Sequence, residues 1–328
     1  DFRDYDVDLS QESVAVVGVG NVAMDVARIL CRTPEELATT DIADYALEKL
    51  RHSKVKNVYI LGRRGPAQAA FTTPEIKELG EMQDADVCVV PEEASLDPLS
   101  EAALADSSDR ATMKKVEVIQ SYAGRPSTGK ARLLTLRFLV SPVELIGNEA
   151  GQVVRMRMVK NKLYKTDSGT LRPKATDEFE EIPVGLVFRS IGYRGVPVPD
   201  VPFYDSWGVI LNKEGQVLDP ETQTPLLGQY TGGWIKRGPS GVIGTNKPDA
   251  LETVQHMLED VAIGKILSPE HPDAEAAAHY IAAKQPDFFS YADWLKLDAL
   301  EIAKGQALGR PRLKFTSVAD MLTAVGKR

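Results

Sequence analysis

The sequence is poor in cysteine, in long apolar runs and in positive charge, and each shortage disfavours a class of protein. Cys31 and Cys88 are its only cysteines. They have neither metal-ligand nor CxxC spacing, so we expect small core residues of a reducing compartment, and disulfide-reductase chemistry is disfavoured. No run approaches the ~18 consecutive apolar residues of a spanning helix. The formal net charge of −8 argues against broad nucleic-acid binding.

Other absences concern the start of the chain and its possible catalytic groups. The chain opens with DFRDYDVDLS, which has no initiator Met and no signal-peptide pattern and is typical of a linker inside a longer protein. The four histidines form no metal-ligand pattern, so no metal site is predicted. We find no Tyr-x-x-x-Lys or catalytic-His arrangement that we can defend as catalytic, which weakens the alternative of an ordinary dehydrogenase that acts on a small substrate.

The most specific short stretch is SVAVVGVGNVAMDVARILCR. It predicts a buried strand over Val14–Val17, a GxGxxA turn over 18–23 and a helix with apolar residues at helical spacing. The residues expected on one helix face are Val22, Val26, Ala27 and Leu30. A plain structural turn is the alternative, but the strand before it and the helix after it favour a dinucleotide site.

Each position of this turn has a mechanical reason. Gly18 permits the tight turn, Gly20 lets the backbone approach a pyrophosphate, and Ala23 lets the helix pack closely on the sheet. The N-terminus of the helix then presents free N–H groups and a positive dipole end to phosphates. The sequence therefore predicts that the loop and the helix start bind the nucleotide.

The second strand, Val55 to Leu61, begins late because a helical insertion, Ile42 to Leu50, occupies the crossover. An NAD site normally has Asp or Glu at the end of this strand, whereas arginine suits a 2′-phosphate. Arg63 and Arg64 stand there, between Gly62 and Gly65. Two solvated surface arginines are the alternative, but beside the GxGxxA turn the pair favours NADP(H) over NAD(H).

A second glycine-rich stretch reads YTGGWIKRGPSGVIGTNKPDALETVQHML. A helix over Ala250 to Val261 is expected there, with Asp249 as its N-cap. The pattern suits a loop that holds a flat ring against backbone amides, and a plain glycine-rich turn is the alternative.

The rest of the chain supplies an antiparallel excursion and further helices. VEVIQSYAG, ARLLTLRFLVSPVELIG and GQVVRMRMVKNKLYK are interpreted as strands, and IPVGLVFRSIGYRG as a returning buried strand. Helices are expected near 250–264, 273–284 and 291–304.

Several of these motifs together resemble a known family. They are GNVAMDVARIL, GRRGPAQAAFTTPEIKEL, RSIGYRGVP, GWIKRGPSGVIGTN and DWLKLDALEIAKGQALGRPRLKF. The chain is similar, from end to end, to the ferredoxin–NADP reductases of the adrenodoxin-reductase type, especially their bacterial branch.

The resemblance implies an α/β fold of glutathione-reductase type with two dinucleotide-binding domains. Residues 1–197 match the NADP(H)-binding domain, and 198–328 match the C-terminal part of a split FAD-binding domain. No second GxGxxG-type fingerprint occurs in the sequence, so the chain is expected to be a fragment without the N-terminal FAD lobe. A bacterial cytoplasmic location is expected.

The resemblance also implies roles for individual residues. Glu75 contacts the nucleotide on the nicotinamide side, and Glu78 is the catalytic acid that handles protons and places the nicotinamide. Without the resemblance, these two are (i, i+3) acids on a solvated helix face. The residues implied to bind NADP(H) are Val19, Gly20, Asn21, Val22, Arg63 and Arg64, and those implied to contact the flavin are Trp234, Gly241, Val242 and Ile243. Pro74 is interpreted as the start of the helix that carries both acids.

The implied activity is ferredoxin–NADP⁺ reductase, with NADP(H) and FAD as cofactors and an acidic iron–sulfur ferredoxin as partner. A basic strand could dock that partner near Arg155, Arg157, Lys160 and Lys162, and a solvated edge strand is the alternative reading. The alternative function is an NADPH-binding electron-transfer subunit whose flavin site another chain completes.

Overall fold

The computed structural model describes residues 3–241 and 243–328, apart from the side chain of Ile243. Two compact units follow from its internal contacts: unit 1 contains residues 1–191 and 289–328, and unit 2 contains residues 192–288. The predicted division at residue 197 assigns the chain to two cofactors, and that assignment stays a prediction.

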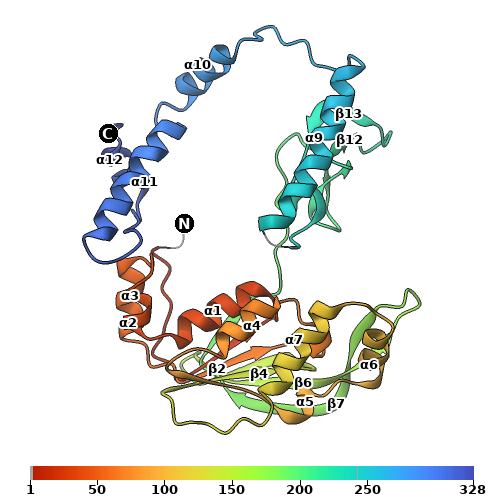
Figure 1. Cartoon of the computed structure of the whole chain (residues 1–328), viewed down its shortest axis with the longest axis vertical. Coiled ribbons are helices and arrows are strands. Elements are labelled where there is room, and N and C mark those ends of the chain that lie inside the picture. Colours follow the sequence, from red (N-terminus) through yellow and green to blue (C-terminus); the bar gives the residue numbers. More distant parts are fainter. Residues whose placement is uncertain (1–2, 242) are drawn as a thin grey trace. The chain divides into compact units, whose positions relative to one another are not determined.

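Unit 1 is built on a parallel sheet, as the sequence predicted. Within the described residues its strand order is β3-β4-β2-β1-β8, and every neighbouring pair is parallel. Figure 1 labels β2 and β4 of this sheet. The strands are β1 Ser13–Val17, β2 Asn57–Leu61, β3 Ala85–Val89, β4 Arg132–Arg137 and β8 Leu186–Arg189. The sequence analysis did not identify β3. The helices between the strands are α1 Asn21–Cys31, α2 Pro34–Leu37, α3 Asp44–Arg51, η1 Pro66–Gln68, α4 Thr73–Leu79, α5 Pro91–Ala94, α6 Pro98–Ala105 and α7 Arg110–Ser121.

Alternating side chains of β1 divide between two cores. Val14 and Val16 pack with apolar residues of α1, α4 and α7 in one core. Ala15 points to the opposite face, where Met156 and Met158 of the antiparallel excursion cover it. The parallel sheet is therefore buried on both faces, which explains its continuous apolar strands.

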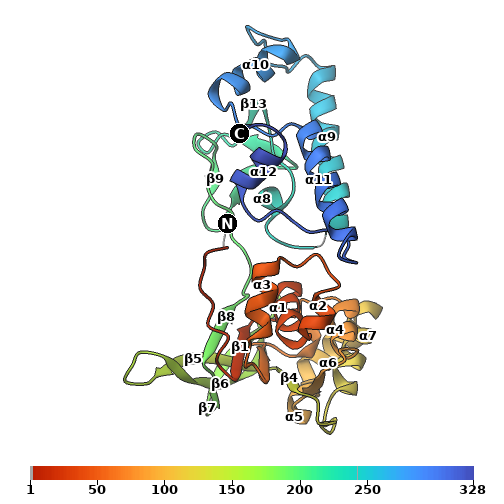
Figure 2. The same ribbon diagram turned by 90° about the vertical axis from the view of Figure 1, so that its left-hand side faces the viewer.

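The antiparallel excursion, β5 Val140–Gly147, β6 Val153–Lys165 and β7 Leu171–Pro183, forms its own sheet in the order β5-β6-β7. Its far end projects away from the parallel sheet (Figure 2). As predicted, buried and exposed side chains alternate along β6: Met156 is buried, and the Arg155 and Arg157 side chains are 55% and 44% exposed.

One predicted strand is wrong. VEVIQSYAG forms the end of α7 and the turn that follows it. The Asp109 side chain accepts a hydrogen bond from the Thr112 N–H at 3.0 Å and caps the helix. Val116 and Ile119 are buried three residues apart, so the helical period outweighs the β-branched composition of the segment.

The predicted insertion in the first crossover forms two short helices, α2 and α3, and it binds the end of the chain. The tail contains α11 Tyr291–Gln306 and α12 Val318–Ala324. The Arg310 side chain donates to the Thr40 carbonyl at 3.0 Å and to Asp44 Oδ1 at 2.5 Å, and Lys314 pairs with Asp41 at 2.6 Å. Figure 1 shows the end of α11 close to α3.

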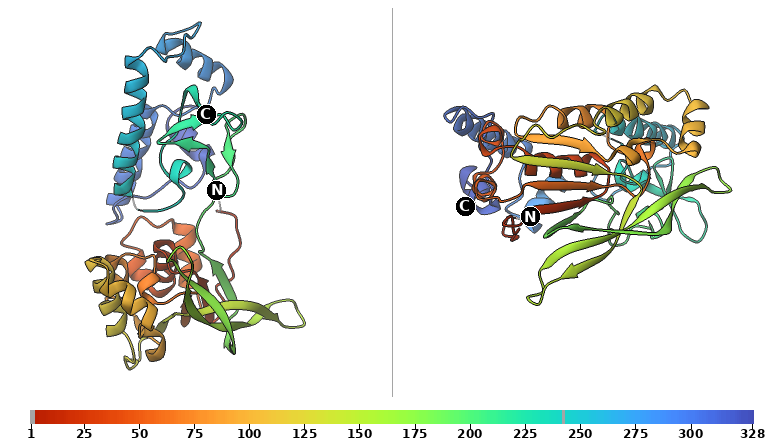
Figure 3. Two further views of the ribbon diagram at one scale, coloured as in Figure 1. Left: turned by 90° about the vertical axis from the view of Figure 1, so that its right-hand side faces the viewer. Right: turned by 90° about the horizontal axis from the view of Figure 1, so that it is seen from below.

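Unit 2 is small and combines short strands with one long helix. Its strands are β9 Phe203–Tyr204, β10 Val209–Ile210, β11 Asn212–Lys213, β12 Gln216–Leu218 and β13 Pro225–Tyr230, and its helices are α8 Trp234–Arg237, η2 Ile243–Thr245, α9 Asn246–Ala262 and α10 Ala274–Lys284. Figure 3 shows α9 running alongside these strands. The predicted helices near 250–264, 273–284 and 291–304 are confirmed as α9, α10 and α11. No helix in the described ranges is long and apolar enough to cross a membrane.

Candidate functional site

The glycine turn and the arginine pair lie side by side because the strands before them end together. Val17 of β1 is paired with Leu61 of β2, and the Gly18 N–H donates to the Leu61 carbonyl at 2.9 Å. Gly18 has φ +130°, and a Cβ at this position would lie 1.9 Å from the Ser190 carbonyl oxygen. The turn therefore requires glycine, as the sequence predicted.

The start of α1 has the features of a phosphate site. Gly20 is the N-cap residue, in an extended conformation, and no side chain caps the helix. A Cβ at Gly20 would meet no atom within 4 Å, so the backbone is open to a close approach. Among the described residues the N–H groups of Asn21 and Val22 have no acceptor, whereas Ala23 donates back to the Gly20 carbonyl at 3.0 Å. These free amides and the helix dipole suit a pyrophosphate.

The helix face differs from the prediction at Val22, which is 40% exposed at the mouth of the turn. Ala23, Ala27 and Leu30 form the buried face. Met24 and Cys31 are buried with them, and the helical period turns Val22 away from this face.

The loop after the arginine pair is fastened to this turn. The N–H groups of Ala70 and Phe71 donate to the Val19 carbonyl at 2.8 and 3.0 Å. The Thr72 N–H donates to Asn21 Oδ1 at 3.0 Å. Val19 and Asn21 thus link the predicted pyrophosphate loop to the segment that leads into α4.

Arg63 and Arg64 follow β2 directly, with Arg63 exposed and Arg64 partly buried. Neither has a carboxylate partner within the described residues, and the one side-chain contact of the pair is from Arg64 to the Gln68 carbonyl at 3.5 Å. Burial and the neighbouring charge of Arg63 lower the pKa of Arg64. By contrast, the partly or fully buried arginines elsewhere in unit 1 have carboxylate partners: Arg28, Arg32, Arg132, Arg137, Arg310 and Arg312. Two adjacent cations without an anion suit a phosphate ligand.

Glu75 and Glu78 lie on α4, which begins one residue before Pro74 as expected. They are not a simple solvated face, because Glu75 accepts a hydrogen bond from Arg28, and Glu78 accepts one from Arg32 at 2.6 Å. Burial alone would lower the pKa of Arg28, but the hydrogen bond to Glu75 and the charge of Glu78 raise it.

Sequence analysis missed the two arginines that hold these acids. Arg28 lies on α1 and Arg32, four residues later, is its C-cap residue, so the helical period places them on one side of the helix. That spacing was a usable signal, but it could not show that α4 packs beside them. The structure brings the acids and the glycine turn onto neighbouring elements of unit 1, and their roles stay predictions.

The second predicted cluster lies in unit 2. Trp234 begins α8, is 43% exposed and stacks on Tyr193 with ring centroids 5.9 Å apart. Gly233 and Gly241 have φ +74° and +81°, and a Cβ at Gly233 would meet no atom within 4 Å. Val242 and the side chain of Ile243 lie outside the described residues. An open glycine backbone beside an aromatic ring fits a flat ligand.

The predicted cap of the long helix is wrong. α9 begins at Asn246, and the mostly buried Asp249 lies within its first turn. Its carboxylate accepts a hydrogen bond from the Gly233 N–H at 2.6 Å and pairs with Lys236 at 3.4 Å. Pro248 is tolerated in a first turn, so the helix starts earlier than the proline suggested. Asp249 therefore fixes the glycine loop and does not cap the helix.

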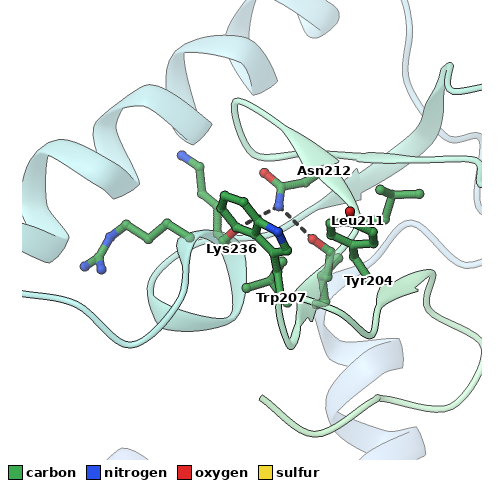
Figure 4. A pocket seen from close by; sticks show the side chains of 8 residues that line it. Tyr204, Trp207, Leu211, Asn212 and Lys236 are labelled. Atoms are coloured by element: carbon green, nitrogen blue, oxygen red, sulfur yellow. Dashed lines mark hydrogen bonds between the residues drawn. The ribbon is translucent and has the colours of Figure 1, made fainter. Parts of the chain in front are cut away.

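A hollow of about 310 Å³ opens beside α8 (Figure 4). Asn212 lies in its wall and donates to the carbonyls of Ile210 and Lys236 at 2.7 and 2.9 Å. Trp234 is not among the residues that line it. Among the predicted flavin contacts that the structure describes, Gly241 does not line it either. The described ranges contain no group of acidic, histidine or cysteine residues placed to hold a metal.

Known proteins resemble the chain over nearly its whole length. No family model matches it. It is 42% identical over 325 residues to the NADPH-ferredoxin reductase FprA of Mycobacterium tuberculosis, which covers 98% of this chain and 69% of that protein. It is 36% identical to the mitochondrial NADPH:adrenodoxin oxidoreductase of Homo sapiens, over 99% of this chain and 66% of that protein.

Solved structures agree with the sequence comparison. The structure of M. tuberculosis FprA in complex with NADPH superposes with a TM-score of 0.87 at 42% identity, over 97% of this chain and 68% of that one. The predicted fold of glutathione-reductase type is thereby confirmed. Taken with the glycine turn and the arginine pair, these matches place the chain in the family of NADPH-ferredoxin reductases of the adrenodoxin-reductase type.

Proposed function

We propose that this chain carries the NADPH site of a ferredoxin–NADP⁺ reductase that uses FAD. Its family membership supports the activity. One observation carries the nucleotide assignment: the cations Arg63 and Arg64 have no carboxylate partner among the described residues. They follow β2, which is paired with β1, and β1 leads through the glycine turn to the open start of α1. A 2′-phosphate supplies the missing negative charge, which the 2′-hydroxyl of NADH lacks.

Each residue then has a defined task toward the nucleotide. The N–H groups of Asn21 and Val22 donate to the pyrophosphate, and Gly20 leaves room for it. Arg63 and Arg64 donate to the 2′-phosphate. Val19 fixes the neighbouring loop through its carbonyl.

The acids of α4 serve the nicotinamide end. We assign Glu75 to contacting the nucleotide on the nicotinamide side, and Glu78 to placing the nicotinamide and handling protons in the reaction. Arg28 bridges the two carboxylates, which keeps both in fixed orientations. Orientation matters here because hydride transfer depends strongly on how the reactants are aligned.

The glycine loop of unit 2 is assigned to the flavin ring. Trp234, Gly241, Val242 and Ile243 would contact it, and the exposed Trp234 with the open backbone at Gly233 fits this role. When bound, FAD supplies the chemistry that converts a hydride from NADPH into single electrons for ferredoxin. We keep the division into an NADP(H) domain, 1–197, and part of an FAD domain, 198–328, and a cytoplasmic location, as parts of this proposal.

The proposal is tested by following NADPH-dependent reduction of a ferredoxin by the FAD-loaded protein, with NADH as the matched comparison. We expect ferredoxin reduction with NADPH and little with NADH. If a second protein chain must be added before flavin is retained and ferredoxin is reduced, the result favours an electron-transfer subunit whose flavin site another chain completes. Equal use of both nucleotides would contradict the assignment of the arginine pair.

The partner is a ferredoxin, and we propose that its acidic surface docks on the basic strand β6. Arg155, Arg157 and Lys160 have acidic partners on neighbouring strands, at 2.9, 3.7 and 3.4 Å. Lys162 faces Lys174 across the hairpin, and neither has an ion-pair partner within the described part of the chain. The outer half of the hairpin therefore presents the less compensated positive charge to a partner.

Replacing Arg155 and Arg157 with glutamate is expected to slow ferredoxin reduction several-fold at low salt and little at high salt, because salt screens exposed charges. The measurement is the ferredoxin reduction rate against ionic strength. The control is Lys49→Glu/Arg51→Glu on α3, which makes the same change in charge away from the hairpin. An equal effect in the control, or an unchanged rate and salt dependence, would remove β6 as the docking strand.

A further inference from the structure

The antiparallel excursion reaches back to the arginine pair. The Leu139 N–H, between β4 and β5, donates to the Arg64 carbonyl at 3.1 Å. The Asn161 side chain on β6 donates through Nδ2 to the Arg63 carbonyl at 3.0 Å. Both carbonyls of the pair are thus held by residues that lie far away in the sequence.

Asn161 is itself fixed on several sides. It is 7% exposed, and its Nδ2 also donates to Ser141 Oγ at 2.8 Å. Its backbone N–H donates to the Leu139 carbonyl at 2.6 Å. The pairing of β6 with β7 shifts register between Val159 and Asn161, so the strand is locally irregular at this residue. Bulges of this kind often re-aim a side chain.

The chemistry of the contact is specific. A carbonyl oxygen can only accept a hydrogen bond, so the amide must turn Nδ2 toward Arg63. A leucine of similar size has no donor, and an aspartate would set a second acceptor against the carbonyl. The Arg63 side chain is exposed and has no side-chain partner among the described residues, so the backbone is the part of this residue that the protein holds, and it sets the point from which the guanidinium group reaches.

We propose that Asn161 is a positioning residue for NADPH specificity, which holds the Arg63 carbonyl so that the two guanidinium groups are oriented toward the 2′-phosphate before the nucleotide arrives. This inference rests on the proposed function of Arg63 and Arg64. Asn161 contacts neither the phosphate nor the reacting atoms. It lowers the cost of ordering the arginine pair on binding.

The test compares NADP⁺ with NAD⁺ by equilibrium binding to the full chain. Asn161→Leu is expected to weaken NADP⁺ binding by about 5- to 10-fold, the loss of one hydrogen bond, and to leave NAD⁺ binding unchanged. In steady-state turnover the KM for NADPH should rise with kcat unchanged. Ser141→Ala is the matched control, because it removes the other partner of the amide and leaves the bond to Arg63 in place.

A second variant guards against misfolding. Asn161→Ser retains a polar side chain that is too short to reach the Arg63 carbonyl, and it should lower the ratio of NADP⁺ to NAD⁺ affinity as Asn161→Leu does. If both variants fail to fold, or if both nucleotides weaken equally, Asn161 supports the fold and not specificity, and the inference is overturned.

A double-mutant comparison separates this inference from the proposed function. In the Arg63→Ala/Arg64→Ala background, Asn161→Leu should cause no further change in the affinity ratio, because the groups that it positions are gone. If the arginine double variant loses discrimination while the Asn161 variants keep it, this inference alone fails. If the arginine double variant keeps discrimination, the proposed function fails and this inference fails with it.

Discussion

Replacing Arg63 and Arg64 together with alanine is expected to remove most of the preference for NADPH over NADH. Hydrogen bonds to charged groups contribute roughly 1.5–3 kcal/mol each. A tenfold change in affinity corresponds to about 1.4 kcal/mol, so loss of both arginines should weaken NADPH binding by about 100-fold or more. NADH binding should change little, because NADH has a hydroxyl where NADPH has the phosphate.

The measurement is a pair of binding titrations, with NADPH and with NADH, on the wild type and the double variant. Arg155→Ala/Arg157→Ala is the matched control, because it removes the same charge from exposed positions on β6. Binding of 2′,5′-ADP should follow the result for NADPH, which locates the effect at the adenosine end. A double variant that keeps its preference would show that the 2′-phosphate binds elsewhere.

Replacing Arg137 with methionine is expected to lower the free energy of unfolding more than any of the other substitutions named above. Its side chain is 7% exposed at the end of β4 and pairs with Glu93 at 2.7 Å and Glu180 at 2.6 Å. Burial alone would lower the pKa of Arg137, but hydrogen bonds to Glu180 and Glu93 raise it. Removing one partner of a buried ionic group leaves uncompensated charge and costs about 3–5 kcal/mol.

Urea unfolding of the wild type and of Arg137→Met measures this loss in the free energy of unfolding. Arg155→Met is the matched control, because Arg155 forms an exposed ion pair with Glu181 within the antiparallel sheet, and its replacement should cost less than about 1 kcal/mol. Equal losses in both variants would show that burial of the Arg137 group adds nothing.

The stability difference should also depend on pH. The hydrogen bond from Arg137 lowers the pKa of Glu180 below its ordinary value of 4.5. A carboxyl group with a lowered pKa in the folded state stabilises the protein above its unfolded pKa, and this contribution is lost as the pH falls through the folded value. In Arg137→Met the Glu180 carboxyl has lost its partner, and protonation relieves the cost of its partial burial. The difference in free energy of unfolding between the wild type and Arg137→Met should therefore become smaller below about pH 4.5 and stay constant near neutrality.

The parts of the fold that could be predicted depend on neighbours in the sequence. β1, the turn at Gly18 and α1 follow from a strand, two glycines and a helical period within twenty residues. The position of the arginine pair follows from the end of one strand. Val116 and Ile119 show the limit, because β-branched composition favoured a strand there while packing against the sheet selects the helix.

The rest of the candidate site depends on contacts between distant residues. Arg28 is 47 residues from Glu75, and Asn161 is 98 residues from Arg63. No local pattern reports such a pair, because the contact exists only after the crossover and the antiparallel excursion have packed. The sequence therefore indicated the residues assigned to the nucleotide, such as Arg63 and Glu75, but not Asn161 and Arg28, which form hydrogen bonds with them.

The hydrogen bonds from Arg310 to the backbone carbonyls of Thr40 and Ile42 join two segments that lie 270 and 268 residues apart in the sequence. A chimera that takes its first crossover from one relative and its C-terminal end from another could place the Arg310 guanidinium group where the matching carbonyl acceptors are missing. The two segments should consequently be exchanged together, and insertions in one should be accompanied by matching changes in the other.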